Sequence, residues 1–387
     1  MSSRPVLFIT SEYPPTGGGI GVYVANLVRV LEARGRDCWV ATWGKASEFP
    51  ATERLFRLPF IPIPPPGDLL FARALRRTVK EAHLENPILN VHSPYPQSAA
   101  EADIATFHIV VRHVLPRGEY AGFKRLQYRI GFPVLCRNER RLLESETVCA
   151  VSNSVADELR DEYSFARKVA VVGNGVDPSH YQPGTLSERP RVLYVGRLDL
   201  NKGVLDFVRM AKLVLAQHPS TIFHIVGRGS AERLVHDEIR RLGLAKTVRV
   251  LGFVSPETLL REYQAAWAYV SPTRFEGLAT TIMEAMSCGT PCIVSDIPSN
   301  RELLSDSEAL FARSQVPEEY ATLVSRILHH PDLIGSLGTS ARREILNRFT
   351  WDHVGDRYEA LLRSSLLDEG ASSYPGERTK IQNAPSS

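Results

Sequence analysis

Two carboxylates stand eight positions apart in this chain, at Glu276 and Glu284, in a setting that suits them to chemistry. Good helix formers follow the first of them, and Gly289 and Pro291 are typical of the point where a helix ends. Eight residues correspond to slightly over two helical turns, about 12 Å of rise. We therefore expect Glu276 in the loop before a helix and Glu284 two turns inside that helix.

Between the two carboxylates the amides of Leu278, Ala279 and Thr280 form a predicted helix N-terminus. Backbone amides at such an end favour an anionic group, for example a phosphate. Carboxylates, in turn, accept hydrogen bonds from sugar hydroxyls. The pattern therefore suits a nucleotide sugar, although the spacing alone is also compatible with a helix that carries two acids by chance.

Two cations, Arg197 and Lys202, follow a predicted strand, and their loop ends in Gly203 at the start of a helix. A cation near a helix N-terminus is disfavoured unless it has an anionic partner. A bound diphosphate would supply that partner, with the arginine forking onto two oxygens and the lysine acting as a point charge. The alternative is a pair of solvated surface cations.

A glycine loop at 17–19, continued by Gly21, lies between a predicted strand and a predicted helix, where backbone amides approach phosphate. Val22 stands where a dinucleotide-binding loop needs glycine, and residues 40–43 at the end of the second strand include no acid. These features exclude an NAD site, and the chain also lacks the P-loop motif. The loop is then either a plain tight turn or a segment that approaches donor phosphate and acceptor together.

Four motifs, in this order along the chain, resemble those of the retaining glycosyltransferases with the two-domain GT-B fold, glycosyltransferase family 4 (glycosyl transferases group 1). They are the glycine loop at 17–19, N-G-V-D at 174–177, G-R-L-x3-K-G at 196–203 and F-E-G-L-x5-E-A-M-x-C-G-T-P at 275–291. The resemblance covers roughly residues 5 to 365.

The resemblance implies a set of functional residues at the matching positions. It implies catalytic roles for His108, Arg197, Lys202 and Glu276. It implies a donor-binding set of Gly18, Gly19, Arg197, Lys202, Val254, Glu276, Gly277, Leu278, Ala279 and Glu284. In this arrangement Glu284 holds the ribose, the two cations hold the diphosphate, and Glu276 grips the donor sugar with His108 across the cleft.

The implied activity is retaining transfer of a hexose-type sugar from a nucleotide diphosphate sugar, with a UDP-sugar favoured over GDP-mannose. The acceptor would be a hydroxyl of a sugar, a lipid-linked compound or a small molecule, in the synthesis of glycans, glycolipids or natural-product glycosides. The chain has no D-x-D pair to hold a metal on the diphosphate, so we expect a metal-independent enzyme without a cofactor. A nucleotide-sugar epimerase on the same architecture and a non-catalytic sugar-binding protein remain alternatives.

Length and patterning predict an α/β chain with two doubly wound, Rossmann-like domains that face a central cleft. The 387 residues exceed what one hydrophobic core usually serves. Short apolar runs spaced by amphipathic stretches predict parallel sheets covered on both faces. The predicted strands are 6–10, 39–42, 88–92, 104–108, 148–152 and 169–172, then 192–195, 222–226, 248–251, 267–271, 292–295 and 309–311.

The predicted organisation has four parts. An acceptor-side domain spans 1–180, a nucleotide-sugar-binding domain spans 181–350, a helix at 351–367 crosses back to the first domain, and 368–387 is a disordered tail. The tail is assigned from its glycine, serine, proline and charged residues, which offer little to bury.

The composition limits where the protein can act and which partners it can bind. A formal charge of +3 does not argue for nucleic acid, and the chain has neither an 18-residue apolar run nor a signal-like start. The five cysteines, odd in number, predict reduced thiols in a cytoplasmic protein. The segment 112–141 mixes many cations with aromatic residues, so it is either an acceptor wall, a peripheral contact with an anionic membrane, or an ordinary helix face.

Overall fold

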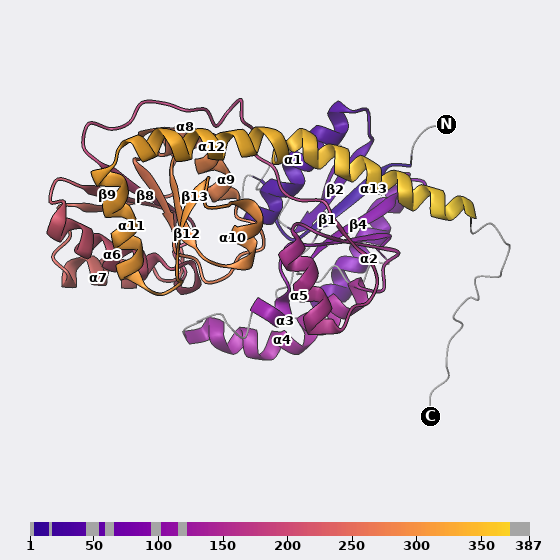
Figure 1. Ribbon diagram of the computed structural model, residues 1–387. Helices are drawn as coiled ribbons and strands as arrows, with labels where there is room; N and C mark the ends of the chain where they lie inside the picture. Colours follow the sequence, from indigo (N-terminus) through magenta and orange to yellow (C-terminus); the bar gives the residue numbers. More distant parts are fainter. Residues whose placement is uncertain are drawn as a thin grey trace.

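The computed structural model describes residues 4–14, 18–43, 54–58, 66–93, 102–114 and 122–371. Within these ranges two parallel sheets lie side by side, each covered by helices, as Figure 1 shows. This arrangement confirms the predicted α/β class with two doubly wound sheets.

The first sheet has seven strands in the order β3-β2-β1-β4-β5-β6-β7, and every pair in it is parallel. The strands are β1 (Val6–Thr10), β2 (Cys38–Trp43), β3 (Leu55–Leu58), β4 (Ile88–Ser93), β5 (Ile104–Phe107), β6 (Thr147–Ala150) and β7 (Val169–Val171). Strand β1 is buried along its whole length, as expected of a central strand covered on both faces.

The second sheet has six strands in the order β10-β9-β8-β11-β12-β13, again all parallel. The strands are β8 (Arg191–Val195), β9 (Ile222–Val226), β10 (Val248–Gly252), β11 (Ala268–Ser271), β12 (Cys292–Ser295) and β13 (Ala309–Ala312). We call residues 4–171 the first half of the chain and residues 191–348 the second half.

The helices alternate with the strands. In the first half they are α1 (Gly19–Ala33), α2 (Pro66–Glu81), α3 (Val111–Val114), α4 (Gly122–Leu142) and α5 (Asn153–Tyr163). In the second half and beyond they are α6 (Val204–Gln217), α7 (Glu232–Arg241), α8 (Pro256–Ala265), α9 (Thr280–Ser287), α10 (Pro298–Leu303), α11 (Pro317–His329), α12 (Asp332–Arg348) and α13 (Trp351–Ala371), with a short 3-10 turn at Leu200–Lys202.

The predicted strands are confirmed apart from shifts at their ends, but strand β3 was not predicted. Its sequence, Leu-Phe-Arg-Leu, is only four residues long and includes an arginine, so it lacks the continuous apolar run of a buried strand. It pairs with β2 at the edge of the sheet, where an arginine side chain can be accommodated.

Helix α13 returns from the second half to the first, where it packs against α1 (Figure 1). The guanidinium of Arg36 donates to both carboxylate oxygens of Glu359, at 2.7 and 2.6 Å. Thr350 precedes the helix, and its hydroxyl accepts from the His353 amide at 3.4 Å, as expected of an N-cap. The prediction that a tail begins at 368 is wrong, because the Asp-Glu-Gly-Ala stretch continues the helix to Ala371.

Both sheets reverse their strand order, between β1 and β4 in the first and between β8 and β11 in the second. In open parallel sheets, ligands bind outside the carboxyl ends of the strands at such a point. The segments that carry the predicted site follow these strand ends. The glycine loop follows β1, Arg197 follows β8, and Glu276 follows β11.

The basic segment at 112–141 is only partly described. Helix α4 carries Pro133 inside it, and on its last turns Arg137, Arg140 and Arg141 are exposed. Among the helices that the structure describes, none has the length and apolar content needed to span a bilayer.

Candidate active site

The two carboxylates of the sequence motif occupy different elements, as predicted, but the helix starts later than expected. Helix α9 begins at Thr280, and Ala279 before it is extended, with φ −77° and ψ 107°. The prediction that the helix includes the amide of Leu278 is therefore wrong, and Glu284 lies little more than one turn inside. The carbonyl of Gly277 bonds to Ser152 of the first half rather than to a helical amide, which keeps this segment extended.

Glu276 forms an ion pair with Lys202, so the first carboxylate and one of the two predicted cations are in direct contact. Both side chains are largely buried, with exposed fractions of 23% and 17%. Lys202 thus has the anionic partner that its position before helix α6 requires. Arg197 is different, because its side chain is 68% exposed and lies 3.5 Å from Asp199.

The loop that carries these cations is braced by backbone contacts. The hydroxyl of Tyr194 donates to the carbonyl of Arg197 at 3.0 Å, and the Arg274 amide donates to the carbonyl of Asn201 at 2.9 Å. Gly203 has φ +69°, and a Cβ atom there would lie 1.9 Å from the carbonyl oxygen of Pro272. The loop before α6 and the loop after β11 therefore interlock, and glycine is required where they cross.

His108 lies just beyond β5 and meets the second half of the chain through its backbone. A Cβ atom at position 277 would lie 2.0 Å from the His108 carbonyl oxygen, so only a glycine permits this approach. The contact brings the segment after Glu276 against His108. The structure therefore places together three of the four residues that we predicted to be catalytic, His108, Lys202 and Glu276, and leaves Arg197 more exposed.

The ring of His108 is buried, and its Nε2 atom lies 2.9 Å from Nδ1 of His92. Burial lowers the pKa of His108 to about 3. Burial also lowers the pKa of His92 well below its ordinary value, and the neighbouring His108 lowers it further. Both rings are therefore neutral at physiological pH, and His108 can exchange hydrogen bonds but cannot supply a charge.

Among the described residues no cation forms an ion pair with Glu284, and tyrosine hydroxyls hold its carboxylate instead. The hydroxyl of Tyr263 donates to its Oε2 at 2.8 Å, and Tyr181 forms a second hydrogen bond. Burial raises the pKa of the Glu284 carboxyl to about 7, against the opposing effect of the two hydrogen bonds. A ribose would therefore meet a carboxylate whose ionisation changes near neutral pH.

The glycine loop of the first half is only partly described, since Gly17 lies outside the described residues. The amide of Gly18 donates to Oε2 of Glu12 at 2.7 Å, and helix α1 begins at the next residue, Gly19. A carboxylate from the same half thus lies at the N-terminal end of α1, where the dipole favours an anion. A phosphate at this place would have to displace Glu12.

The remaining predicted donor-binding residues lie on the second half. The amides of Gly277 and Leu278 donate to no protein acceptor within the part of the chain that the structure describes, although both residues are buried. Buried amides are almost always paired, so these two are suited to a ligand. Val254 follows the edge strand β10 and is partly buried. Among the described residues, no cluster of three or more His, Cys, Asp or Glu side chains is arranged to hold a metal ion.

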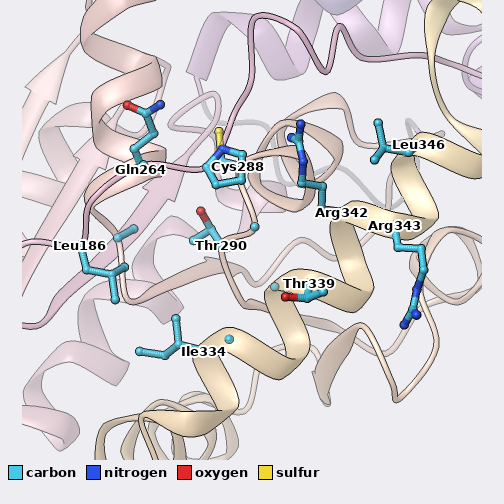
Figure 2. Close-up of a pocket in the computed structure, with 15 residues that line it drawn as sticks. Leu186, Gln264, Cys288, Thr290, Ile334, Thr339, Arg342, Arg343 and Leu346 are labelled. Carbon is cyan, nitrogen blue, oxygen red and sulfur yellow. The ribbon is translucent and has the colours of Figure 1, made fainter.

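A pocket of about 380 Å³ opens at the other end of α9, between that helix end and α12 (Figure 2). Cys288 and Thr290 line it from one side and Arg342 from the other. The Arg342 guanidinium donates to the carbonyls of Tyr181 and Ser287, so its positive charge is used to bind backbone oxygens. The pocket's lining includes none of the predicted donor-binding residues.

Sequence reasoning missed several residues that shape this site. They are Glu12, His92, Ser152, Tyr263 and Glu302. Only Glu12 had a usable signal, because a lone acid between a strand and a glycine loop faces a helix N-terminus. The others contact residues far away along the chain, and no local pattern marks them.

Two family models match the chain and together span most of it. The model described as Glycosyltransferase Family 4 matches residues 17–180, and the model described as Glycosyl transferases group 1 matches residues 177–344. The two matched regions meet between β7 and β8. The first region includes strands β2 to β7 but not β1, and the second includes all six strands of the second sheet.

Known proteins resemble the chain over nearly its full length. The D-inositol 3-phosphate glycosyltransferase of Acidothermus cellulolyticus is 28% identical over 92% of this chain and 88% of its own length. The sucrose-phosphate synthase of Thermosynechococcus elongatus has the same fold, with a TM-score of 0.83, 21% identity and coverage of 95% of this chain and 100% of that one. The Anabaena protein HepE, solved with UDP and glucose, gives a TM-score of 0.73 at 17% identity, over 94% of this chain and 100% of that one. For two other curated relatives, the chain spans only 58% and 52% of their length.

Proposed function

The chain belongs to the glycosyltransferases of group 1 and family 4, and from this membership we propose that it moves a hexose-type sugar from a nucleotide diphosphate sugar to an acceptor hydroxyl. The transfer retains the anomeric configuration, and the acceptor is a sugar, a lipid-linked compound or a small molecule. The products belong to glycan, glycolipid or natural-product glycoside synthesis.

One observation carries this proposal. The segment after Glu276 lies against His108. A carboxylate, a cation and two amides that have no partner in the described chain therefore meet at the carboxyl ends of strands from both sheets. A donor sugar needs acceptors for its hydroxyls, and its diphosphate needs positive charge and N–H donors. This junction supplies both.

The ion pair between Lys202 and Glu276 supports an exchange of partners on donor binding. A diphosphate would compete with Glu276 for the Lys202 ammonium. Glu276 would then be released to accept hydrogen bonds from the sugar hydroxyls. Arg197, whose side chain is exposed, would add a second cation as negative charge develops on the leaving diphosphate.

By analogy with the family, the leaving phosphate then takes the acceptor proton on the same face of the sugar, since no side chain in the described part of the site stands out as a nucleophile. The charge on the diphosphate is met by Lys202, Arg197 and the amides, without a metal. Activity should therefore survive EDTA at full rate. Loss of turnover on chelation, restored by Mg²⁺ or Mn²⁺, would contradict a metal-independent enzyme.

The donor is a UDP-sugar in preference to GDP-mannose. The complex of HepE with UDP and glucose, on the same fold, supports this choice. A thermal-shift screen over UDP-, GDP-, ADP- and TDP-sugars tests it. A donor present at 100 times its dissociation constant should add about 2.7 kcal/mol of stability, and a larger shift with GDP-mannose would overturn the preference.

Incubation with labelled UDP-glucose in the absence of acceptor tests the reaction class. Slow hydrolysis favours a transferase, exchange of the C2 hydrogen with solvent favours an epimerase on the same architecture, and silence favours a non-catalytic binder. Lys202→Gln should abolish the hydrolysis, whereas Lys212→Gln, which removes an exposed cation of α6, should leave it unchanged. Equal loss in both variants would contradict the assigned role of Lys202.

The enzyme acts in the cytoplasm and contacts the inner face of the membrane peripherally through the basic segment 112–141. The exposed arginines at the end of α4, Arg137, Arg140 and Arg141, support this proposal, because anionic lipids attract clustered cations. Cosedimentation with vesicles of phosphatidylserine and phosphatidylcholine, compared with phosphatidylcholine alone, tests it. Equal binding to both vesicles, or to neither, would contradict it.

A further inference from the structure

The N-terminus of helix α5, in the first half, touches the second half at the candidate site. Ser152 precedes this helix and is fully buried. Its hydroxyl accepts a hydrogen bond from the Val155 amide at 3.1 Å, which makes it the helix N-cap. The same hydroxyl donates its proton to the carbonyl of Gly277 at 2.8 Å. One side chain therefore caps a helix in one half and holds the backbone of the other.

The bond from Ser152 sets the direction of a neighbouring amide. The carbonyl of Gly277 and the N–H of Leu278 belong to one planar trans peptide, so they point in opposite directions. When Ser152 holds the carbonyl, the Leu278 N–H has to point away from α5. Within the described chain this N–H has no protein partner. It is one of the two amides assigned above to the donor.

A second contact holds the same helix end. Glu302, on α10 of the second half, accepts from the Asn153 amide and from its side-chain Nδ2, both at 2.8 Å. It also accepts from the Ser154 amide at 3.0 Å. The first amides of a helix lack partners inside it, and its dipole favours a carboxylate there. Glu302 supplies both the acceptor and the charge from the opposite half.

We propose that Ser152 is a positioning residue for sugar transfer and that Glu302 secures it. When the halves dock, Glu302 binds the end of α5, and this places the Ser152 hydroxyl on the Gly277 carbonyl. The peptide between Gly277 and Leu278 is then turned so that its N–H faces the donor. The inference rests on the proposed function, because it assumes that this amide binds the sugar nucleotide.

Turnover tests the positioning role. Ser152→Ala should lower kcat about tenfold, the effect of one lost hydrogen bond, and leave the dissociation constant of UDP within twofold of the wild type. Ser152→Thr, which keeps the hydroxyl, should restore most of the rate. Ser152→Ala also loses a helix cap, so its melting temperature is measured alongside. A lower melting temperature with unchanged kcat would show a purely structural serine and overturn the proposal.

Glu302→Gln should reproduce part of the kcat loss, and the double variant should lose no more than Ser152→Ala alone, because both residues act on one peptide. Glu308→Gln is the matched control. Glu308 also accepts from a backbone amide, that of Ser305, but only within the second half. Additive losses in the double variant, or an equal loss in the control, would overturn the coupling.

Hydrogen exchange tests the contact between Glu302 and the N-terminus of α5 independently of catalytic activity. The amides of Asn153 and Ser154 should be protected in the wild type and exchange at least tenfold faster in Glu302→Ala. Rapid exchange in the wild type would overturn the contact whatever the activity. Protected amides in a protein that turns over no nucleotide sugar would instead reject the proposed function and, with it, the positioning role of Ser152, while the contact stands.

Discussion

The loops of the second half and the glycine loop of the first half are held in different ways. In the second half backbone meets backbone, as where Gly203 crosses Pro272. In the first half Gly18 meets the end of one flexible side chain, the carboxylate of Glu12 at 2.7 Å. Backbone contacts permit no adjustment, whereas a side chain can turn away. The loops of the second half are therefore fixed before the ligand binds, whereas the glycine loop can adapt at Gly18.

The contact between the halves at Gly277 also joins backbone to backbone, and its loss should give the largest effect. Gly277→Ala would place a Cβ atom 2.0 Å from the His108 carbonyl oxygen, and neither backbone can move freely. The halves would be held apart at the reacting groups. A displacement of about 1 Å can cost a hundredfold in rate, so we expect kcat to fall by about that factor.

In Gly277→Ala we expect nucleotide binding, unlike turnover, to be almost unchanged. The ribose and diphosphate ligands lie in the second half, so the dissociation constant of UDP by calorimetry should change less than twofold. Gly335→Ala is the control, since a Cβ atom there meets nothing within 4 Å. If Gly277→Ala weakened UDP binding as much as turnover, the second half would not be an independent nucleotide site.

Glu284→Ala should give the next largest effect, on affinity rather than on rate. Removing a charged acceptor for two ribose hydroxyls costs about 1.5–3 kcal/mol, roughly a 10- to 150-fold rise in the dissociation constant. Calorimetry with UDP measures it. Tyr263→Phe removes one hydrogen bond to Glu284 but keeps the carboxylate, so it should retain most of the affinity. An unchanged constant for Glu284→Ala would reject the ribose assignment.

Much of the fold was predictable from local sequence, whereas the joins between the halves were not. Buried strands such as β1 and β12 are continuous apolar runs, and Gly289 adopts the positive φ expected of a helix end, +68°. Ser152 and Glu302, in contrast, bond to residues 125 and 149 positions away. Their importance depends on how the two sheets meet, which no local pattern encodes. The late start of α9 has the same origin.

The pH dependence of donor binding sharpens the assignment of Glu284. Burial raises the pKa of its carboxyl to about 7 in the free protein. Ribose hydroxyls donate to the ionised form, so binding is strongest above this pKa and weakens as the pH falls through it. Between pH 8 and pH 6 the ionised fraction falls from about nine-tenths to about one-tenth, and affinity should fall about tenfold.

A nucleotide sugar is the right ligand for this measurement, because its diphosphate carries no group that titrates near pH 7, unlike free UDP. Glu284→Gln should bind weakly with a flat profile. Glu139, whose pKa burial also raises to about 7, lies in the first half and remains in this variant. A profile that kept its slope in Glu284→Gln would assign the titration to another group.

The smallest effect should come from the glycine loop, where the comparison between rigid and adaptable contacts is tested within one segment. In Gly18→Ala the new methyl group pushes on the Glu12 carboxylate. At most, the hydrogen bond from the Gly18 amide to this carboxylate is lost, which costs about 0.5–1.5 kcal/mol. Turnover should therefore fall only several-fold, and the affinity for UDP should not change. Gly21→Ala is the opposite case, since its Cβ atom would lie 2.8 Å from the backbone carbon of Glu12. It should lower the melting temperature by several degrees, because backbone must shift at the start of α1.

If Gly18→Ala destabilised the fold as much as Gly21→Ala, the glycine loop would be as rigidly held as the loops of the second half. If Gly18→Ala instead lost UDP binding in proportion to turnover, the loop would be a primary phosphate site, and the division of labour between the two halves would be wrong.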